Sequence, residues 1–309
     1  MSNPLRTFFL LTGLIATFLI VGDMAGGERG ILIGLVLALG LGLVAYLNAD
    51  RFVLALYRAR AVDGTDPDPR IQAFVKDTLK MAEQACMPLP RIYLTDQSQP
   101  NAFTAGRDPA HASVIATQGM IEVLNRREIR AVMAHELAHI ISGHTLPMTL
   151  TATMAGTLSA LGSLSALSGI LQKEERQSAR SGRPGSSLLA PVAAALVRMS
   201  IRRHRVFQAD RIGADICGDP EALASALRKI AASVRDVPNR TALVHPATSH
   251  LFIVNPLRRQ GFEAGSLRLS DTGVFQERRQ ARGVDALFST HPDTGQRVAA
   301  LLDMANRRC

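Results

Sequence analysis

Two apolar runs near the start of the chain constrain its fold more than any other feature. Thr7–Gly22 and Gly30–Leu47 contain no charged residue over 16 and 18 positions, and a short loop with Asp23, Glu28 and Arg29 joins them. These lengths lie at the lower limit for a helix that crosses the hydrocarbon core of a bilayer. We therefore expect a helical hairpin that anchors the chain in a lipid bilayer.

A secretory signal peptide is the alternative for the first run, because Arg6 precedes it. No A-x-A cleavage site follows, however, and the second apolar run begins within ten residues. The hairpin is the better interpretation.

A third apolar run, Leu146–Leu171, is long enough to cross a bilayer and is rich in Leu, Ala, Ser, Gly and Thr. Small residues of this kind let helices approach closely in lipid. Ser187–Ile201 is a weaker candidate, because Pro191 and Arg198 interrupt it, and a buried helix of a soluble domain is the alternative. The segment between the two runs, 172–186, is charged and rich in Gly, Pro and Ser, which predicts a loop.

The chain is basic, with a formal net charge of +9. We do not expect nucleic acid as a partner, because Trp is absent, Tyr occurs three times and no motif combines aromatic with basic residues. Much of the positive charge instead follows the apolar runs, at Arg51, Arg58, Arg60, Arg198, Arg202, Arg203 and Arg205. By the positive-inside rule, the N-terminus and the region after Leu47 face the cytoplasm.

The cysteines agree with this location. Cys86, Cys217 and Cys309 are too few and too scattered for a disulfide framework, and none forms a CxxC pair that would bind a metal. A reducing compartment fits this pattern.

The polar part of the chain has an α+β pattern. Pro69–Cys86 carries apolar residues at helical spacing, and three short segments between Pro, Gly and Asp residues are strand candidates. These strand candidates are Arg91–Thr95, Asn101–Ala105 and Ala112–Thr117.

A capped helix is predicted over Asn125–Gly143. Asn125 and Glu128 have the spacing of a capping box, with an amide at the N-cap and a carboxylate three residues later. Gly143 is a suitable stop. An apolar stripe lies between them at helical spacing, made by Ile129, Val132, Met133, Leu137, Ile140 and Ile141.

This helix carries the motif HExxH as His135, Glu136 and His139. The histidines are four residues apart, so they project from one face, only about 40° apart around the helix axis. Two imidazoles so placed can share one Zn²⁺, with Glu136 as general base for the attacking water. The alternative is two surface histidines on an amphipathic helix. Because this helix is capped, otherwise apolar and next to a membrane run, we favour the metal site.

A third metal ligand must come from elsewhere. The metzincin pattern needs Gly at position 142 and His at position 145, where this chain has Ser142 and Thr145. His144 is out of that register. A glutamate from a later helix is therefore the expected arrangement.

Several separated segments together resemble the HtpX family of membrane-bound zinc proteases, which are relatives of the CAAX prenyl proteases. The similarity covers nearly the whole chain and is far more specific than HExxH alone. Besides the N-terminal hairpin, its pieces are Pro100–Gly106, Ala134–His139, Arg203–Ala214, Pro246–Phe252 and Ser289–Pro292.

The resemblance implies a zincin-type, gluzincin-like domain, mostly helical with a small sheet, and one zinc ion per chain on His135 and His139. It also implies that Asn101, Ala102 and Phe103 lie on an edge strand above the metal. Such a strand aligns the main chain of a protein substrate by strand addition, which tolerates varied sequences.

Two further histidines, His250 and His291, fall in family-like segments. One of them can stabilise the transition state by polarising the scissile carbonyl, as histidines do in other zinc proteases. The alternative is that both only cap or pack.

One departure from the family pattern concerns the third ligand. The family keeps a glutamate in the slot that Val206 occupies here, and an isopropyl group cannot bind a metal. The chain is then a pseudoprotease, a substituted variant of an active enzyme, or an enzyme in which a neighbour replaces the ligand. Asp210 shares the helix face, but it is short and is expected to orient a ligand histidine. His204 points about 160° away from Val206.

We divide the chain into a transmembrane hairpin (1–60), a metalloprotease domain (61–145 and 202–309) and an inserted hydrophobic or transmembrane pair (146–201). The implied function is quality-control endoproteolysis of membrane or misfolded proteins. The implied location is the bacterial inner membrane, with several membrane passes and a cytoplasmic catalytic domain. A membrane scaffold of the same fold that binds proteins without cleaving them is the competing hypothesis.

Overall fold

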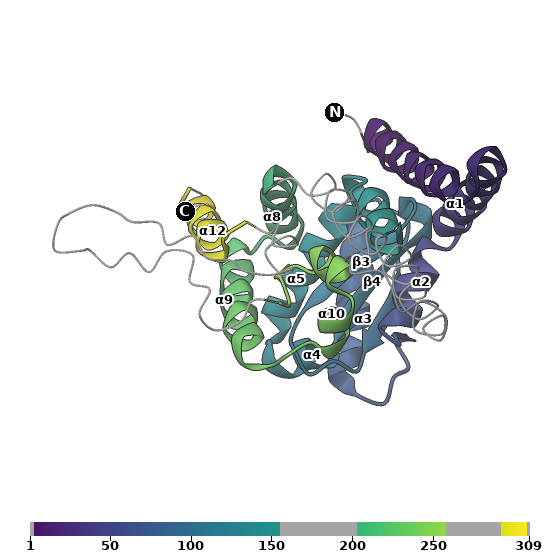
Figure 1. Cartoon of the computed structure of the whole chain (residues 1–309). Helices are drawn as coiled ribbons and strands as arrows, with labels where there is room; N and C mark the ends of the chain where they lie inside the picture. The colour runs from purple at the N-terminus through teal and green to yellow at the C-terminus, as the bar shows by residue number, and fades with distance from the viewer. Residues whose placement is uncertain (1–2, 155–202, 258–291, 308–309) are drawn as a thin grey trace, which may run out of the picture.

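The structure is a computed structural model, and it describes residues 3–154, 203–257 and 292–307 (Figure 1). Most of the apolar run Leu146–Leu171 lies outside these ranges, as do the loop at 172–186 and the run Ser187–Ile201. His291 lies outside them as well.

The N-terminal helix α1, Asn3–Leu47, consists of two arms that meet at a break in the main chain. At Gly26 and Gly27 the backbone angles leave the helical region, with φ at +55° for Gly27, and the chain turns back. The arms touch through glycine, since a side chain on Gly22 would overlap the carbonyl of Gly30. This pair of helices is drawn in purple in Figure 1 and projects from the rest of the molecule beside α2.

A four-stranded sheet has the strand order β1-β2-β4-β3. The parallel pair β2 (Arg91–Thr95) and β4 (Ala112–Thr117) has the bounds that the sequence predicts. Strand β3 (Ala102–Gly106) is shifted by one residue from its prediction and pairs antiparallel with β4. The short β1 (Arg60–Ala61) pairs antiparallel with β2, and two residues are too few to form a detectable pattern.

The central helix is α5, Arg126–Ile141, and every residue from Ala131 to Ile140 is buried. It contacts the two strands β3 and β4 and the helices α3, α8 and α9. The predicted apolar stripe therefore understates its burial, because several elements enclose this helix. The enclosing helices are α3 (Pro69–Gln84), α8 (Arg203–Cys217) and α9 (Pro220–Asp236), with α12 (Thr294–Asn306) packed on α8 and α9.

Helix α3 ends at Gln84, two residues before its predicted end, and Cys86 has a positive φ of 51°. Residues 145–154 form a helix directly after α5. The shorter elements are α2 (Ala49–Leu56), η1 (Pro109–His111), α4 (Gln118–Val123), α10 (Arg240–Val244) and η2 (Pro246–Leu251).

Candidate metal centre

The first turn of α5 is held by the predicted capping box. The Asn125 side chain accepts from the Glu128 N–H at 3.0 Å, and the Glu128 carboxylate accepts from the Asn125 N–H at 2.9 Å. Ser225 and Lys229 of α9 also donate to this carboxylate, at 2.7 and 2.8 Å. Burial alone would raise the pKa of Glu128, but these partners outweigh it and lower the pKa. The start of the helix is therefore fixed to α9.

Two turns further on, His135 and His139 lie side by side on α5. Their ring centroids are 4.8 Å apart, and both side chains are buried. Burial lowers the pKa of both imidazoles, well below the usual range for His139. The neutral imidazole is the form that binds metals.

His135 is oriented by a buried ion pair that joins α8 and α12. Its Nδ1 lies 2.9 Å from Oδ1 of Asp210, in a geometry too bent for a straight hydrogen bond. Arg297 donates to both oxygens of Asp210, at 2.8 and 2.7 Å. Burial would raise the pKa of Asp210, but the charge and hydrogen bonds of Arg297 hold it below its usual range. Asp210 therefore stays ionised beside His135.

The helices approach closely enough for this contact because α8 has a glycine where it crosses α5. A side chain at Gly213 would lie 2.7 Å from Cα of His135. Asp210 is three residues earlier on α8.

Glu136 is a buried carboxylate that lacks hydrogen-bond partners among the described residues. Its side chain is 1% exposed, and neither carboxylate oxygen has a hydrogen-bond partner of good geometry within the described residues. Burial raises the pKa of Glu136 to about 8, although the Thr104 hydroxyl of β3 offsets part of the effect. Buried carboxylates without partners are rare and call for an unseen ion or water. Two neutral imidazoles beside such a group fit a divalent metal ion.

The residue at the expected position of the third ligand cannot bind a metal together with His135 and His139. Val206 lies on α8 one turn before Asp210 and is partly buried, while His204 is exposed. Within the described residues, no group of three or more His, Cys, Asp or Glu side chains is arranged to hold a metal ion. The described residues that would hold a zinc ion are therefore His135 and His139.

The strand expected to align the substrate is already paired at one end. Asn101, Ala102 and Phe103 are fully buried, and the Asn101 amide donates to the carbonyl of Val254 at 2.8 Å. On the outer edge of β3, the N–H of Ile253 donates to the carbonyl of Ala102 at 2.9 Å.

Further along the same edge, the N–H of Gly106 donates to the hydroxyl of Thr149 at 3.1 Å. Between these two points, an isolated antiparallel bridge pairs Phe103 with Phe252, so the edge at Thr104 is covered as well. Because main-chain groups alternate in direction along a strand, those of Thr104 face the same edge as those of Ala102 and Gly106.

His250 is buried in the structure and does not face solvent. Its side chain is 1% exposed, and its Nε2 lies 3.0 Å from the carbonyl oxygen of Met148. This contact holds the segment after α10 to the helix at 145–154.

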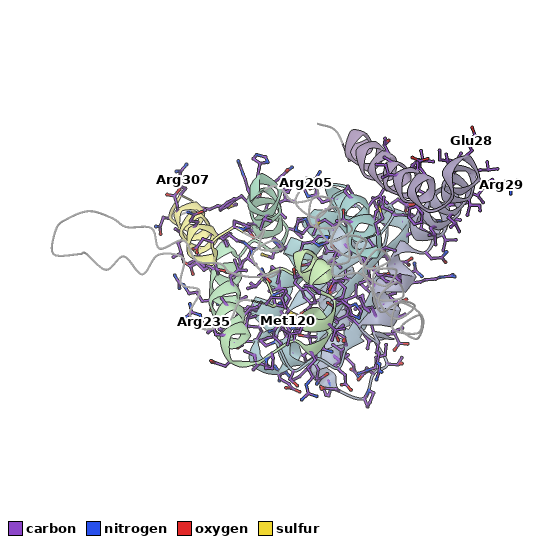
Figure 2. The ribbon with its side chains drawn as sticks, in the orientation of Figure 1. Glu28, Arg29, Met120, Arg205, Arg235 and Arg307 are labelled. Carbon is purple, nitrogen blue, oxygen red and sulfur yellow. The ribbon has the colours of Figure 1, made fainter. Side chains whose placement is uncertain are left out.

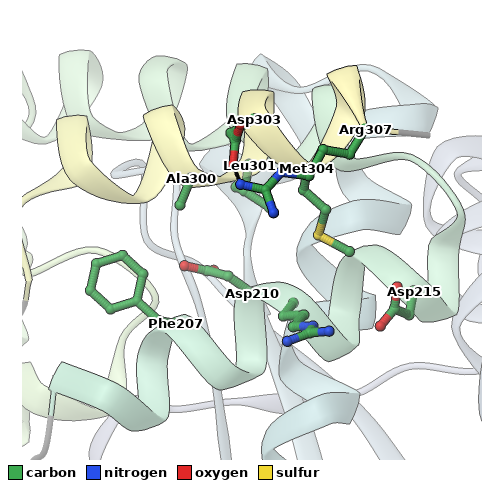
Figure 3. A pocket seen from close by; sticks show the side chains of 9 residues that line it. Phe207, Asp210, Asp215, Ala300, Leu301, Asp303, Met304 and Arg307 are labelled. Atoms are coloured by element: carbon green, nitrogen blue, oxygen red, sulfur yellow. Dashed lines mark ion pairs between the residues drawn. The ribbon is translucent and has the colours of Figure 1, made fainter. Parts of the chain in front are cut away.

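A cavity of about 450 Å³ lies between α8 and α12, with Phe207, Asp210 and Met304 among its walls (Figure 3). None of His135, Glu136 and His139 lines it. The cavity therefore borders the ion pair of Asp210 and is separate from the candidate metal centre.

Two residues of this centre are not predicted from the sequence. Arg297 is the largest fully buried side chain in the described structure, and its only sequence signal is a lone arginine among apolar residues of α12. Thr104 follows the Asn101–Phe103 motif directly, but nothing in the sequence marks it as the neighbour of Glu136.

A buried HExxH helix, an ionised aspartate behind the first histidine and an edge strand beside the glutamate form the pattern expected of a metallopeptidase centre. A model of peptidase family M48 matches residues 66–305, and the chain belongs to this family of metalloendopeptidases.

Its relatives agree with the resemblance drawn from the motifs. The chain is 42% identical over 305 residues to the Protease HtpX homolog of Burkholderia thailandensis, covering 99% of this chain and 98% of that protein. It is also 42% identical over 306 residues to the Protease HtpX homolog of Burkholderia mallei, with the same coverage. The crystal structure of Ste24p from S. mikatae superposes at 17% identity with a TM-score of 0.47, over 93% of this chain and 62% of that one.

Proposed function

We propose that this chain is a membrane-anchored zinc endopeptidase that cleaves membrane or misfolded proteins. The observation that carries the proposal is Glu136, a buried carboxylate without good partners beside two neutral histidines of one helix face. A structural glutamate would be paired at this depth, as Glu128 is on the same helix.

The residues of the centre support hydrolysis through an activated water. Zinc, when bound by His135 and His139, makes a water molecule acidic enough to lose a proton near neutral pH. Glu136 takes that proton while the water oxygen bonds to the scissile carbonyl carbon. Glu136 then passes the proton to the amine nitrogen as the C–N bond breaks. Asp210 keeps the ring of His135 in place throughout.

The substrate would lie along the outer edge of β3. The main chain of Thr104 faces this edge, which an antiparallel bridge between Phe103 and Phe252 covers, and the Thr104 hydroxyl is next to Glu136. A substrate that pairs with Asn101–Phe103 would therefore have to displace residues 251–253 from this edge. Pairing through main-chain groups would admit substrates of many sequences.

The exposed face of α1 supports a membrane anchor. Gly26–Val44 is, among the described residues, the helix long and apolar enough to cross a membrane, judged by length and composition. Large apolar side chains are exposed along it, namely Leu32, Ile33, Val36, Leu39 and Leu43. Glu28 and Arg29 lie at the turn of the hairpin, away from the rest of the molecule (Figure 2). Contiguous exposed apolar surface of this kind indicates a lipid or protein contact.

An impermeant thiol reagent tests the orientation in a cysteine-free background. We expect Arg70→Cys to be protected in intact cells and Glu28→Cys to be labelled from outside. Labelling of position 70 from outside would contradict a cytoplasmic catalytic domain.

A non-catalytic scaffold is the second candidate function, because Val206 stands where a carboxylate ligand is expected. Substitution of Val206 by Glu tests the slot, and Val206→Gln is the matched control of the same shape without the charge. We expect Val206→Glu to raise zinc affinity and the rate of cleavage of an unfolded membrane protein, and Val206→Gln to raise neither comparably.

Zinc content and cleavage activity of the unsubstituted parent protein distinguish the enzyme from the scaffold. Near-stoichiometric zinc and Glu136-dependent cleavage in the parent support the enzyme. Absence of both in the parent, with gain of both in Val206→Glu, supports the scaffold. If Val206→Glu changes neither quantity, the assignment of the slot is wrong.

A further inference from the structure

The end of α5 folds a second imidazole back onto His139. After Ile141 the chain reverses at Gly143, whose φ is +63°. The N–H of Gly143 donates to the carbonyl of Ile140 at 3.0 Å, and that of His144 donates to the carbonyl of His139 at 2.9 Å. These two bonds are those of a Schellman motif, in which the residue after the glycine contacts the third residue from the helix end.

In most Schellman motifs that contact is between apolar side chains, but here it joins two histidines. His144 is 5% exposed, and its ring centroid lies 5.5 Å from that of His139. The two Nδ1 atoms are 3.3 Å apart. At this distance one nitrogen must carry the hydrogen and the other must accept it, since two bare or two protonated nitrogens would repel.

We infer that His144 is a positioning residue that accepts the Nδ1–H of His139 and so presents Nε2 of His139 to the metal. The inference rests on the proposed function. It gives each ligand histidine its own partner, with Asp210 behind His135 and His144 behind His139. Partners of this kind fix the tautomer and the ring orientation of a ligand.

The two partners differ in charge. Asp210 is ionised and paired with Arg297, whereas an accepting His144 is neutral. His144 therefore orients its ligand through the hydrogen bond alone. A centre that lacks a carboxylate ligand at Val206 depends more on the orientation of its two histidines.

Three substitutions at one position test this role in the full-length protein in detergent. Asn carries a side-chain oxygen at the place of Nδ1, Gln carries its amide near the place of Nε2, and Phe keeps the ring without an acceptor. We expect His144→Phe and His144→Gln to weaken zinc binding by about 10–100-fold. We expect His144→Asn to stay within a few-fold of the parent. A general loss of packing would not separate Asn from Gln in this way.

Cobalt substitution then distinguishes positioning from direct ligation. The visible spectrum of bound Co²⁺ reports the number and type of its ligands, so it should keep its shape in His144→Asn. A changed spectrum in that variant would show that His144 is itself a ligand and would overturn the inference.

His139→Ala separates this inference from the proposed function. Loss of zinc in His139→Ala with parental affinity in His144→Phe would overturn the role of His144 alone. Zinc binding that survives His139→Ala would overturn both.

Discussion

Each half of α5 contains one buried glutamate, and the pKa values of the two glutamates are shifted in opposite directions. Glu128, in the first turn, is buried and accepts hydrogen bonds from the cap and from α9, and its pKa is lowered. Glu136, two turns later, lies deeper in the protein, lacks such partners and has a pKa raised to about 8. Burial acts on both groups and more strongly on Glu136, so the depth and the partners together decide the direction of each pKa shift. We propose that the paired glutamate serves stability and that the unpaired one takes part in the reaction.

Substitution of Glu136 is expected to have the largest effect on the rate of hydrolysis. Glu136→Gln should lower the rate of hydrolysis by about 10²–10⁴-fold, because the amide cannot accept the proton of the water. Zinc content should be unchanged, since the proposed function makes Glu136 the base and not a ligand. Both quantities are measured in the parent and in the Val206→Glu background. Unchanged activity would show that another residue is the base, and loss of zinc would show that Glu136 supports the metal itself.

Substitution of Arg297 tests the buried ion pair with Asp210, which lies behind His135 in the second half of α5. Arg297→Met should lower the free energy of unfolding by about 3–5 kcal/mol, because it leaves the buried carboxylate of Asp210 without a counter-charge. Asp210→Asn in the same chain should recover part of the loss. Denaturant unfolding of both single variants and the double variant measures this coupling. Strictly additive effects would mean that the two residues do not act as a pair.

The contact between α5 and α8 is tested at Gly213. Gly213→Ala would place a methyl group 2.7 Å from Cα of His135. The helices must then separate, at a cost of about 1–3 kcal/mol in stability, and zinc affinity should fall because Asp210 moves with α8. Gly64→Ala is the control, since a methyl group there meets nothing within 4 Å. Equal effects of the two substitutions would exclude a specific role for the crossing.

The smallest effect is expected at the cap of the paired half. Asn125→Ala should cost about 1 kcal/mol of stability, since one hydrogen bond of the capping box is lost. Zinc affinity and turnover should stay at the parental values. Asn125→Asp, which can still cap, should be close to neutral. A large loss of zinc in Asn125→Ala would show that the two halves of the helix are not independent.

Local features of the fold could be predicted from the sequence, and contacts across the chain could not. The capping box at Asn125 and Glu128, the stop at Gly143 and the strands β2 and β4 each depend on a few neighbouring residues. The partner of Asp210 is 87 residues away, and no local pattern connects Arg297 to it.

The contacts that the motif residues make could not be predicted from the sequence either. The pairing of Ile253 with Ala102 joins segments that are remote in sequence, so the occupied edge of β3 could not be predicted from the Asn101–Phe103 motif. His144 is close to His139 in sequence, but its contact depends on the reversal at Gly143. Sequence spacing identifies it only as out of register for a ligand.

The position of Arg297 in the network has a consequence for the order of events during synthesis. Arg297 donates to Asp210 behind His135 and also to the carbonyl of Ile253, whose N–H is bonded to Ala102 of β3. It is made after every other member of this network. We therefore expect the nascent chain to lack a finished active centre until α12 has been made.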